Sequence, residues 1–198
     1  MSARLEGAPR PVERTQRGRR VHFDTQGGRC LAGLACSAPM RVHLGSDHAG
    51  FELKVAIVRR LTELGHEPVD HGPVKYDAVD DYPPYVLAAA AATAAESGSR
   101  GVVLGGSGNG EAMAANKVAG IRCALAWSIE TAQLARAHND ANVVSLGARM
   151  HDEVTALAIL EAFLATGYSG ADRHTRRITM LSDYERSGDL PPLPPAGG

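Results

Sequence analysis

Apolar runs of strand length alternate with segments of helical character from residue 41 to residue 186. The runs with strand character cover residues 41–46, 66–70, 101–105, 121–127 and 142–146. The segments with helical character cover residues 51–64, 85–96, 111–117, 131–138, 152–166 and 171–186. Strands and helices that alternate at this spacing form βαβ units around a parallel sheet. The pattern predicts an α/β fold, a Rossmann-like three-layer sandwich with a five-stranded parallel sheet and helices on both faces.

The clearest helical signal is the first one. Leu53, Ile57, Leu61 and Leu64 fall on one stripe of a helix, and Gly65 stands where helices commonly end. The following stretch, residues 72–84, is polar, contains three prolines and is predicted to be a loop.

Both ends of the chain lack this alternation. Residues 1–40 carry seven arginines against three acidic residues, and residues 191–198 are rich in proline. We expect a disordered extension over residues 1–39, one folded domain over residues 40–187 and a disordered tail over residues 188–198. An arginine-rich start is also compatible with a transit peptide, a nucleic-acid-binding arm, or translation that begins at Met40.

Composition narrows the class of protein. Apolar residues make up 44% of the chain and aromatic residues 5%, which favours close packing of helices on a sheet. The net charge of −1 gives no general attraction to nucleic acid or to an acidic membrane surface. The three cysteines have neither zinc-ligand spacing nor a disulfide framework, and no apolar run approaches the ~20 residues of a membrane span. These features predict a cytoplasmic protein without a metal site.

The turn after the first strand carries a candidate site. It reads Gly45-Ser46-Asp47-His48-Ala49-Gly50. A dinucleotide-binding fingerprint requires glycine at position 47, where a carboxylate would repel pyrophosphate, so NAD binding is not favoured. Taken alone, Asp47 is equally compatible with a helix N-cap.

A second turn, Gly105-Gly106-Ser107-Gly108-Asn109-Gly110-Glu111, joins a buried strand to a helix. Consecutive backbone N–H groups in such a turn bind anions, but no Gly-Lys-Ser/Thr follows, which excludes a nucleoside triphosphate P-loop. Glu111 beside these donors would be a weak base unless burial raises its pKa, and it is also compatible with a first-turn acid favoured by the helix dipole.

Three further positions carry ionisable side chains suited to proton transfer or to binding an anion. His138-Asn139 ends a helix, where histidine is either a proton carrier or a partner of the helix dipole. Arg173 and Arg177 are four residues apart, so they project from one helix face as a phosphate clamp or as a solvated basic face.

Taken together, these motifs resemble ribose-5-phosphate isomerase of type B, whose relatives include galactose-6-phosphate isomerase. The resemblance covers residues 40–186. The matching motifs are Gly45-Ser46-Asp47-His48-Ala49-Gly50, Gly106-Ser107-Gly108-Asn109-Gly110-Glu111 with Ala114-Ala115-Asn116-Lys117, His138-Asn139, Arg149, Arg173 and Arg177.

The resemblance implies an aldose–ketose isomerase of the non-oxidative pentose phosphate pathway, which interconverts ribose 5-phosphate and ribulose 5-phosphate through an enediolate without cofactor or metal. Many members place a cysteine base at the position of Gly105, whereas a subgroup similar to this chain uses a glutamate at the end of the loop. The implied catalytic residues are therefore Glu111, the base, and His138, which assists ring opening.

The resemblance also assigns the binding residues. The implied substrate-binding residues are Asp47, His48, Tyr82, Gly106, Ser107, Gly108, Asn109, Gly110, Asn139, Arg149, Arg173 and Arg177. The glycine loop alone favours a phosphate site, but the family uses it for the reacting oxygens and binds phosphate with arginines. The family is dimeric with shared pockets, and the likeness places His138, Asn139 and Arg149 in the contribution of the partner chain.

Two alternatives remain open on sequence. One is the same reaction on a six-carbon sugar phosphate, such as allose or galactose 6-phosphate. The other is a sugar-phosphate-binding module without catalysis, which would have no need of a carboxylate at Glu111.

Overall fold

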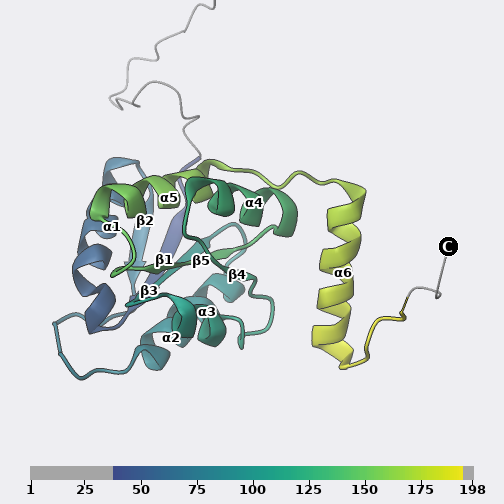
Figure 1. Ribbon diagram of the computed structural model, residues 1–198, viewed down its shortest axis with the longest axis horizontal. Helices are drawn as coiled ribbons and strands as arrows, with labels where there is room; N and C mark the ends of the chain where they lie inside the picture. The colour runs from purple at the N-terminus through teal and green to yellow at the C-terminus, as the bar shows by residue number, and fades with distance from the viewer. Residues whose placement is uncertain (1–37, 194–198) are drawn as a thin grey trace, which may run out of the picture.

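The computed structural model describes residues 38–193, and these form a parallel sheet covered by helices on both faces (Figure 1). The five strands stand in the order β2-β1-β3-β5-β4, all parallel. The strands are β1 (Arg41–Ser46), β2 (Glu67–Asp70), β3 (Arg100–Gly105), β4 (Cys123–Leu125) and β5 (Val143–Gly147). The helices are α1 (Phe51–Glu63), α2 (Tyr82–Ala95), α3 (Asn109–Ala115), α4 (Ile129–Asn139), α5 (Glu153–Ala165) and α6 (Asp172–Ser187), with a 3-10 turn η1 (His48–Gly50). The predicted fold class is confirmed.

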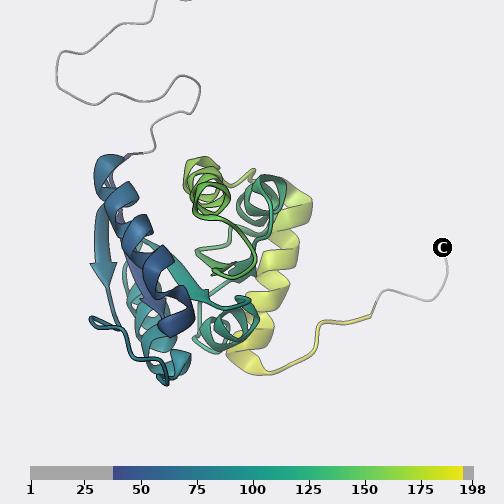
Figure 2. The ribbon, with the colours of Figure 1, turned by 60° about the vertical axis from the view of Figure 1, so that its left-hand side comes forward.

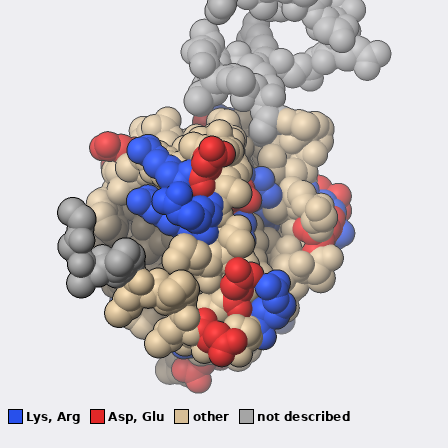
Figure 3. Space-filling model, turned by 90° about the vertical axis from the view of Figure 1, so that its right-hand side faces the viewer, with Lys and Arg blue, Asp and Glu red and all other residues tan. Residues whose placement is uncertain are grey.

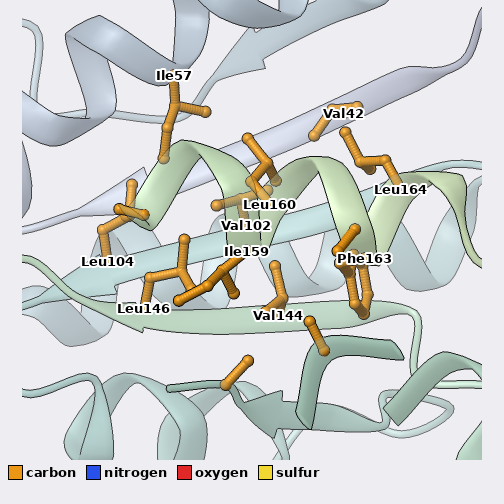
Figure 4. Close-up of a cluster of buried hydrophobic side chains, with 14 of the residues drawn as sticks. Val42, Ile57, Val102, Leu104, Val144, Leu146, Ile159, Leu160, Phe163 and Leu164 are labelled. Atoms are coloured by element: carbon orange, nitrogen blue, oxygen red, sulfur yellow. The ribbon is translucent and has the colours of Figure 1, made fainter. Parts of the chain in front are cut away.

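Two apolar cores lie on the two faces of the sheet. Helices α1, α4 and α5 cover one face, and α2 and α3 cover the other (Figure 1). Figure 4 shows the larger core, where Ile159, Leu160 and Phe163 of α5 meet Leu104 and Val144 of the strands. All five side chains are fully buried, and each such burial contributes about 1.5–3 kcal/mol relative to exposure.

Helix α6 stands apart from both layers. Figures 1 and 2 show it at the side of the molecule that carries α4, where the Gly120 backbone N–H donates to the Glu185 carboxylate at 2.9 Å. Of its sixteen residues, only His174 is buried. A helix gains most of its stability by packing an apolar face, and within the described residues α6 packs very little of its surface.

Some boundaries differ from expectation. Helix α2 begins at Tyr82, so Pro83 and Pro84 belong to its first turn, where a missing N–H costs nothing. The expected strand over 121–127 shortens to β4, whose first residue, Cys123, is bound at its N–H and its C=O by the Asn116 side chain, at 2.8 and 2.9 Å.

The predictions for the ends of the chain lie largely outside the described residues. The structure describes nothing of residues 1–37 or 194–198, so the N-terminal extension is untested, and residues 188–193 have no regular secondary structure. Among the described residues, no helix is long and apolar enough to cross a membrane.

The order of the strands places a crevice at one edge of the sheet. The chain continues from β1 to β2 on one side and later enters β3 on the other side of β1. At such a switch point the loops after the two strands diverge, and ligands bind between them. The two loops here contain Asp47-His48 and residues 106–110.

Candidate active site

Asp47 directly follows β1 and is the N-cap of the turn η1. Its Oδ1 accepts the backbone N–H groups of Ala49 and Gly50 at 2.9 and 3.2 Å, so the predicted helix-capping role is present. The carboxylate is buried, and its charge acts on Glu111 across the crevice. Asp47 therefore caps the turn after β1 and also contributes a negative charge that acts on Glu111.

Glu111 is buried at the first turn of α3, with 4% of its surface exposed. Its carboxylate lies directly against the Cα of Gly105, so that a Cβ built on Gly105 would overlap it. Burial raises the pKa of Glu111, the negative charge of Asp47 acts in the same direction, and the backbone amides of Glu111 and Gly108 oppose both. The carboxylate is therefore a stronger base than an exposed glutamate.

The glycine loop has a specific shape. Gly108 has φ = 80°, a left-handed conformation that favours glycine, and its carbonyl accepts the Ser145 hydroxyl at 2.7 Å. The Tyr82 ring covers Gly110 so closely that a Cβ there would lie 2.8 Å from its hydroxyl oxygen. Ser107 is exposed at the mouth of the loop, and its Oγ accepts the Asn109 backbone N–H at 3.3 Å.

Arg149 lies on the same edge of the sheet as this loop. Its backbone N–H donates to the Gly106 carbonyl at 3.0 Å. Its guanidinium also reaches Gly106, where a Cβ would lie 3.4 Å from Nη1. The Arg149 guanidinium therefore lies beside the glycine loop of its own chain.

His48 is held by Asp80, a residue of the loop before α2. Asp80 Oδ1 accepts the His48 backbone N–H at 2.8 Å and lies 2.9 Å from ring Nδ1. This hydrogen bond is the main cause that raises the pKa of His48, and the charges of Asp47 and Asp80 add to it against partial burial. The His48 ring is consequently biased toward its charged form.

A second group of predicted residues gathers where α4 meets α6. The rings of His138 and His174 stack with centroids 4.2 Å apart, and Arg173 Nε donates to His174 Nε2 at 3.1 Å. Burial lowers the pKa of His174, and the charges of His138, Arg173 and Arg177 lower it further. Figure 3 faces the side of the molecule with α6 and shows Lys and Arg side chains gathered in one area of it.

The two groups lie at opposite edges of the sheet. Helix α4 starts near the carboxyl end of β4 and returns to the amino end of β5, and its eleven residues span about 16 Å. His138 and Asn139 are at its far end, whereas Glu111 is at the carboxyl edge. One chain therefore holds two half-sites: the edge half-site with Asp47, His48, Tyr82, residues 106–111 and Arg149, and the helical half-site with His138, Asn139, Arg173 and Arg177.

This grouping bears on two expectations. Arg149 lies beside Gly106 of its own chain and away from His138 and Asn139, whereas the contribution of these three residues to a partner's pocket stays a prediction. The sequence alone does not assign Arg173 and Arg177 to either half-site. Arg173 bonds the histidine that stacks on His138, so the arginine pair belongs to the helical half-site.

Two residues that support the edge half-site and its neighbouring loop were missed from sequence. Asp80 is one of several aspartates in residues 77–81, and nothing local distinguishes it from its neighbours. Lys54 is fully buried and donates to Asp70 Oδ1 at 2.8 Å and to the Pro73 carbonyl at 2.6 Å. Its position on the apolar stripe of α1, next to Leu53 and three residues before Ile57, is a signal that could have identified it.

Comparisons with known proteins bear on this geometry. A family model described as Ribose/Galactose Isomerase matches residues 42–181. The chain is 58% identical over 157 residues to ribose-5-phosphate isomerase B of Mycobacterium tuberculosis (strain ATCC 25618 / H37Rv), covering 79% of this chain and 97% of that protein. It is 59% identical over 159 residues to the protein of that name from Mycolicibacterium paratuberculosis, covering 80% and 100%.

Solved structures of type B ribose 5-phosphate isomerases have a similar fold. Ribose-5-phosphate isomerase B from Mycoplasma genitalium, with bound ribulose-5-phosphate, superposes with a TM-score of 0.72 at 38% identity and covers 75% of this chain and 97% of its own. The type B ribose 5-phosphate isomerase of Trypanosoma brucei gives 0.70 at 43% identity, covering 74% and 99%.

Proposed function

The chain belongs to the ribose/galactose isomerase family, and from that premise we infer how its two half-sites interconvert ribose 5-phosphate and ribulose 5-phosphate. The protein is an aldose–ketose isomerase, and its reaction belongs to the non-oxidative pentose phosphate pathway. The observation that carries the mechanism is the buried Glu111 carboxylate at the switch point of the sheet.

Glu111 is the base of the reaction. Its carboxylate takes the proton from C2 of the open-chain aldose, the C–H electrons form the C1–C2 double bond, and the π electrons of the C1 carbonyl move to O1, which gives the enediolate. Glu111 then returns the proton to C1 while the hydroxyl proton of O2 passes to O1, so that C2 becomes the carbonyl carbon and O1 becomes a hydroxyl. The raised pKa of Glu111 brings its basicity closer to neutral pH, where general-base catalysis is most effective.

The glycine loop stabilises the charge that develops on the reacting oxygens. The Ser107 hydroxyl and the N–H groups of residues 106–110 are the donors at this edge. Loss of one such donor typically costs about 3 kcal/mol of transition-state stabilisation. Asp47 and Tyr82 line the same crevice and orient the sugar.

The other half of each pocket comes from a second copy of the chain. The partner subunit's His138 assists ring opening, the partner subunit's Asn139 contacts the sugar, and the partner subunit's Arg173 and Arg177 bind the phosphate together with His48 and Arg149. A homodimer is supported by α6, whose Leu181 is 63% exposed, and by Trp127, 64% exposed beside the edge strand β4.

The protein acts in the cytoplasm, as one domain over residues 40–187, and needs no metal ion for the proton transfer. The carboxylate and the loop donors supply both the base and the charge stabilisation, so the chemistry is complete without a Lewis acid. Activity that persists in excess chelator is the expected result, and loss that added metal reverses would contradict it.

A turnover assay tests the proposal. Wild-type protein is offered ribose 5-phosphate, allose 6-phosphate and galactose 6-phosphate, and the five-carbon substrate is expected to give the highest kcat/KM. Glu111→Gln is expected to abolish isomerisation while ribose 5-phosphate still binds. Turnover by Glu111→Gln near the wild-type rate would remove Glu111 from the role of base, and binding without turnover in the wild type would favour a binding module.

A further inference from the structure

His48 is hydrogen-bonded to the carboxylate of Asp80, a residue that is not among the site residues expected from the sequence. Asp80 Oδ1 accepts both the His48 backbone N–H and the proton of ring Nδ1, at 2.8 and 2.9 Å. We propose that Asp80 is a positioning residue, which fixes the His48 ring in its charged form and directs Nε2–H to the phosphate of the substrate. The inference rests on the proposed function, because it takes His48 as a phosphate ligand.

The hydrogen bonds leave one ring nitrogen for a ligand. Because Nδ1 is engaged by Asp80, Nε2 is the nitrogen that can donate outward, and the side chain is 26% exposed. A single acceptor oxygen that binds both the backbone and the ring of His48 restricts its rotamer. The ring of Tyr76 stands edge-on to it at 6.5 Å, on the side of the loop.

The charges around His48 favour imidazolium. The charged groups that act on His48 are Asp80 and Asp47, and both are carboxylates. Asp80 is itself 6% exposed at its side chain, and its buried Oδ2 has no hydrogen-bond partner among the described residues. A buried carboxylate with one unsatisfied oxygen is costly unless a cation balances it, and His48 is the cation in contact.

The loop that carries Asp80 is anchored at both ends. At its start, Lys54 binds the Pro73 carbonyl and Asp70, and Asp70 Oδ1 also accepts the Gly72 N–H at 2.8 Å. At its end, the loop enters α2 at Tyr82. This fixed frame holds Asp80 against His48 before substrate arrives, which is the arrangement that positioning requires.

The test compares Asp80→Asn with the control Asp77→Asn, an exposed aspartate of the same loop whose Oδ1 accepts the Val79 N–H. The pKa of His48 is measured by NMR titration of the imidazole, with His48→Gln to assign the signal. KM and kcat for ribose 5-phosphate are measured from pH 6 to pH 8.5.

Asp80→Asn should lower the pKa of His48 and raise KM at pH 7.5 about tenfold, which corresponds to about 1.4 kcal/mol, with kcat changed less than about twofold. The difference in KM should shrink toward pH 6, where His48 is protonated in both proteins. Asp77→Asn should match the wild type. An unchanged His48 pKa, an unchanged KM, or a loss confined to kcat would overturn the inference.

Two further measurements cover the cases in which Asp80→Asn does not fold or the wild type does not isomerise ribose 5-phosphate. If Asp80→Asn does not fold, Asp80→Glu keeps the charge and should retain a raised His48 pKa, and an ordinary pKa there would count against the inference. If the wild type fails to isomerise ribose 5-phosphate, the proposed function fails. The His48 signal with added inorganic phosphate then decides, since it should shift in the wild type and less in Asp80→Asn.

Discussion

Glu111 and Gly105 act as one unit at the scale of the residue. The carboxylate occupies the space that any side chain at position 105 would need, and burial there raises its pKa. The resemblance described above implies a cysteine base at the position of Gly105 in many family members. If Glu111 is the base, as proposed, its carboxylate fills the space that a side chain at position 105 would occupy, and the reacting group reaches one point in space from two positions in the sequence.

The pH dependence of turnover should reflect this environment. A carboxyl with a raised pKa keeps its proton to higher pH, so the ionised base is lost as pH falls through that raised value. The acid limb of kcat/KM should lie above the ordinary glutamate pKa of about 4.3. Asp47→Asn removes one of the causes and should move the limb to lower pH, whereas Glu52→Gln, an exposed change on α1, should leave it in place. A wild-type limb at or below the ordinary value would contradict the assignment.

A double-mutant cycle tests the shared space. Gly105→Ala should displace the Glu111 carboxylate, abolish turnover and lower the free energy of unfolding. With Glu111→Ala present, the same change should cost less stability, with a coupling of about 1–3 kcal/mol, because the overlap is gone. Denaturant unfolding of the four proteins gives the coupling, and additive changes in free energy would show that the two positions do not compete.

Helix α6 has its clearest role at the scale of the element. Arg173 and Arg177 occupy its first two turns beside His174, whereas Arg186, in the last turn, pairs with Asp183 at 2.6 Å. Two guanidinium groups on one face can bind a phosphate dianion with directed hydrogen bonds. The proposed phosphate clamp therefore lies at the start of the helix.

Substitutions along α6 should separate by position. Arg173→Ala and Arg177→Ala should each raise KM for ribose 5-phosphate about tenfold or more with a smaller change in kcat, since a charge-assisted hydrogen bond to phosphate is lost. Arg186→Ala should leave both constants near the wild-type values. Steady-state kinetics on the three variants checks this, and equal effects at all three positions would indicate a general electrostatic contribution in place of a clamp.

The elements themselves were largely predictable because their signals are local. The stripe of Leu53, Ile57 and Leu61 predicts α1, and the glycines of residues 105–110 predict the loop after β3. Asp80 was not predictable, because its role depends on a contact with His48 across 32 residues of sequence. The separation of Arg149 from His138 also depends on which edge of the sheet each residue reaches, and no local pattern encodes that.

At the scale of the whole molecule, the proposed mechanism needs both half-sites, and they lie apart in one chain. The edge half-site has the proposed base but lacks His138, and the helical half-site has the arginine pair but lacks Glu111. Apolar side chains are exposed on the elements near β4 and α6; those more than about 60% exposed there are Met113, Trp127 and Leu181. A two-fold pairing that covers these side chains and brings unlike half-sites together would form two pockets at once.

Mixing of inactive variants tests this arrangement. Glu111→Gln and His138→Ala damage different half-sites, so a mixed dimer keeps one intact pocket. Random exchange of equal amounts should restore about a quarter of wild-type activity. Glu111→Gln mixed with Arg149→Ala should restore nothing, because both changes lie in the edge half-site. Recovery is measured after subunit exchange in the turnover assay, and equal recovery in both mixtures would contradict the division into halves.

The burial of Cys123 bears on chemical inhibition. Cys123, the cysteine within the described residues, is partly shielded in β4, and burial raises the pKa of its thiol to about 12, which leaves very little thiolate to react. Alkylating agents and peroxides react with thiolates, so they should react only slowly with Cys123. Compounds selective for this enzyme would have to exploit a carboxylate instead, for example through a cation or an epoxide directed at Glu111.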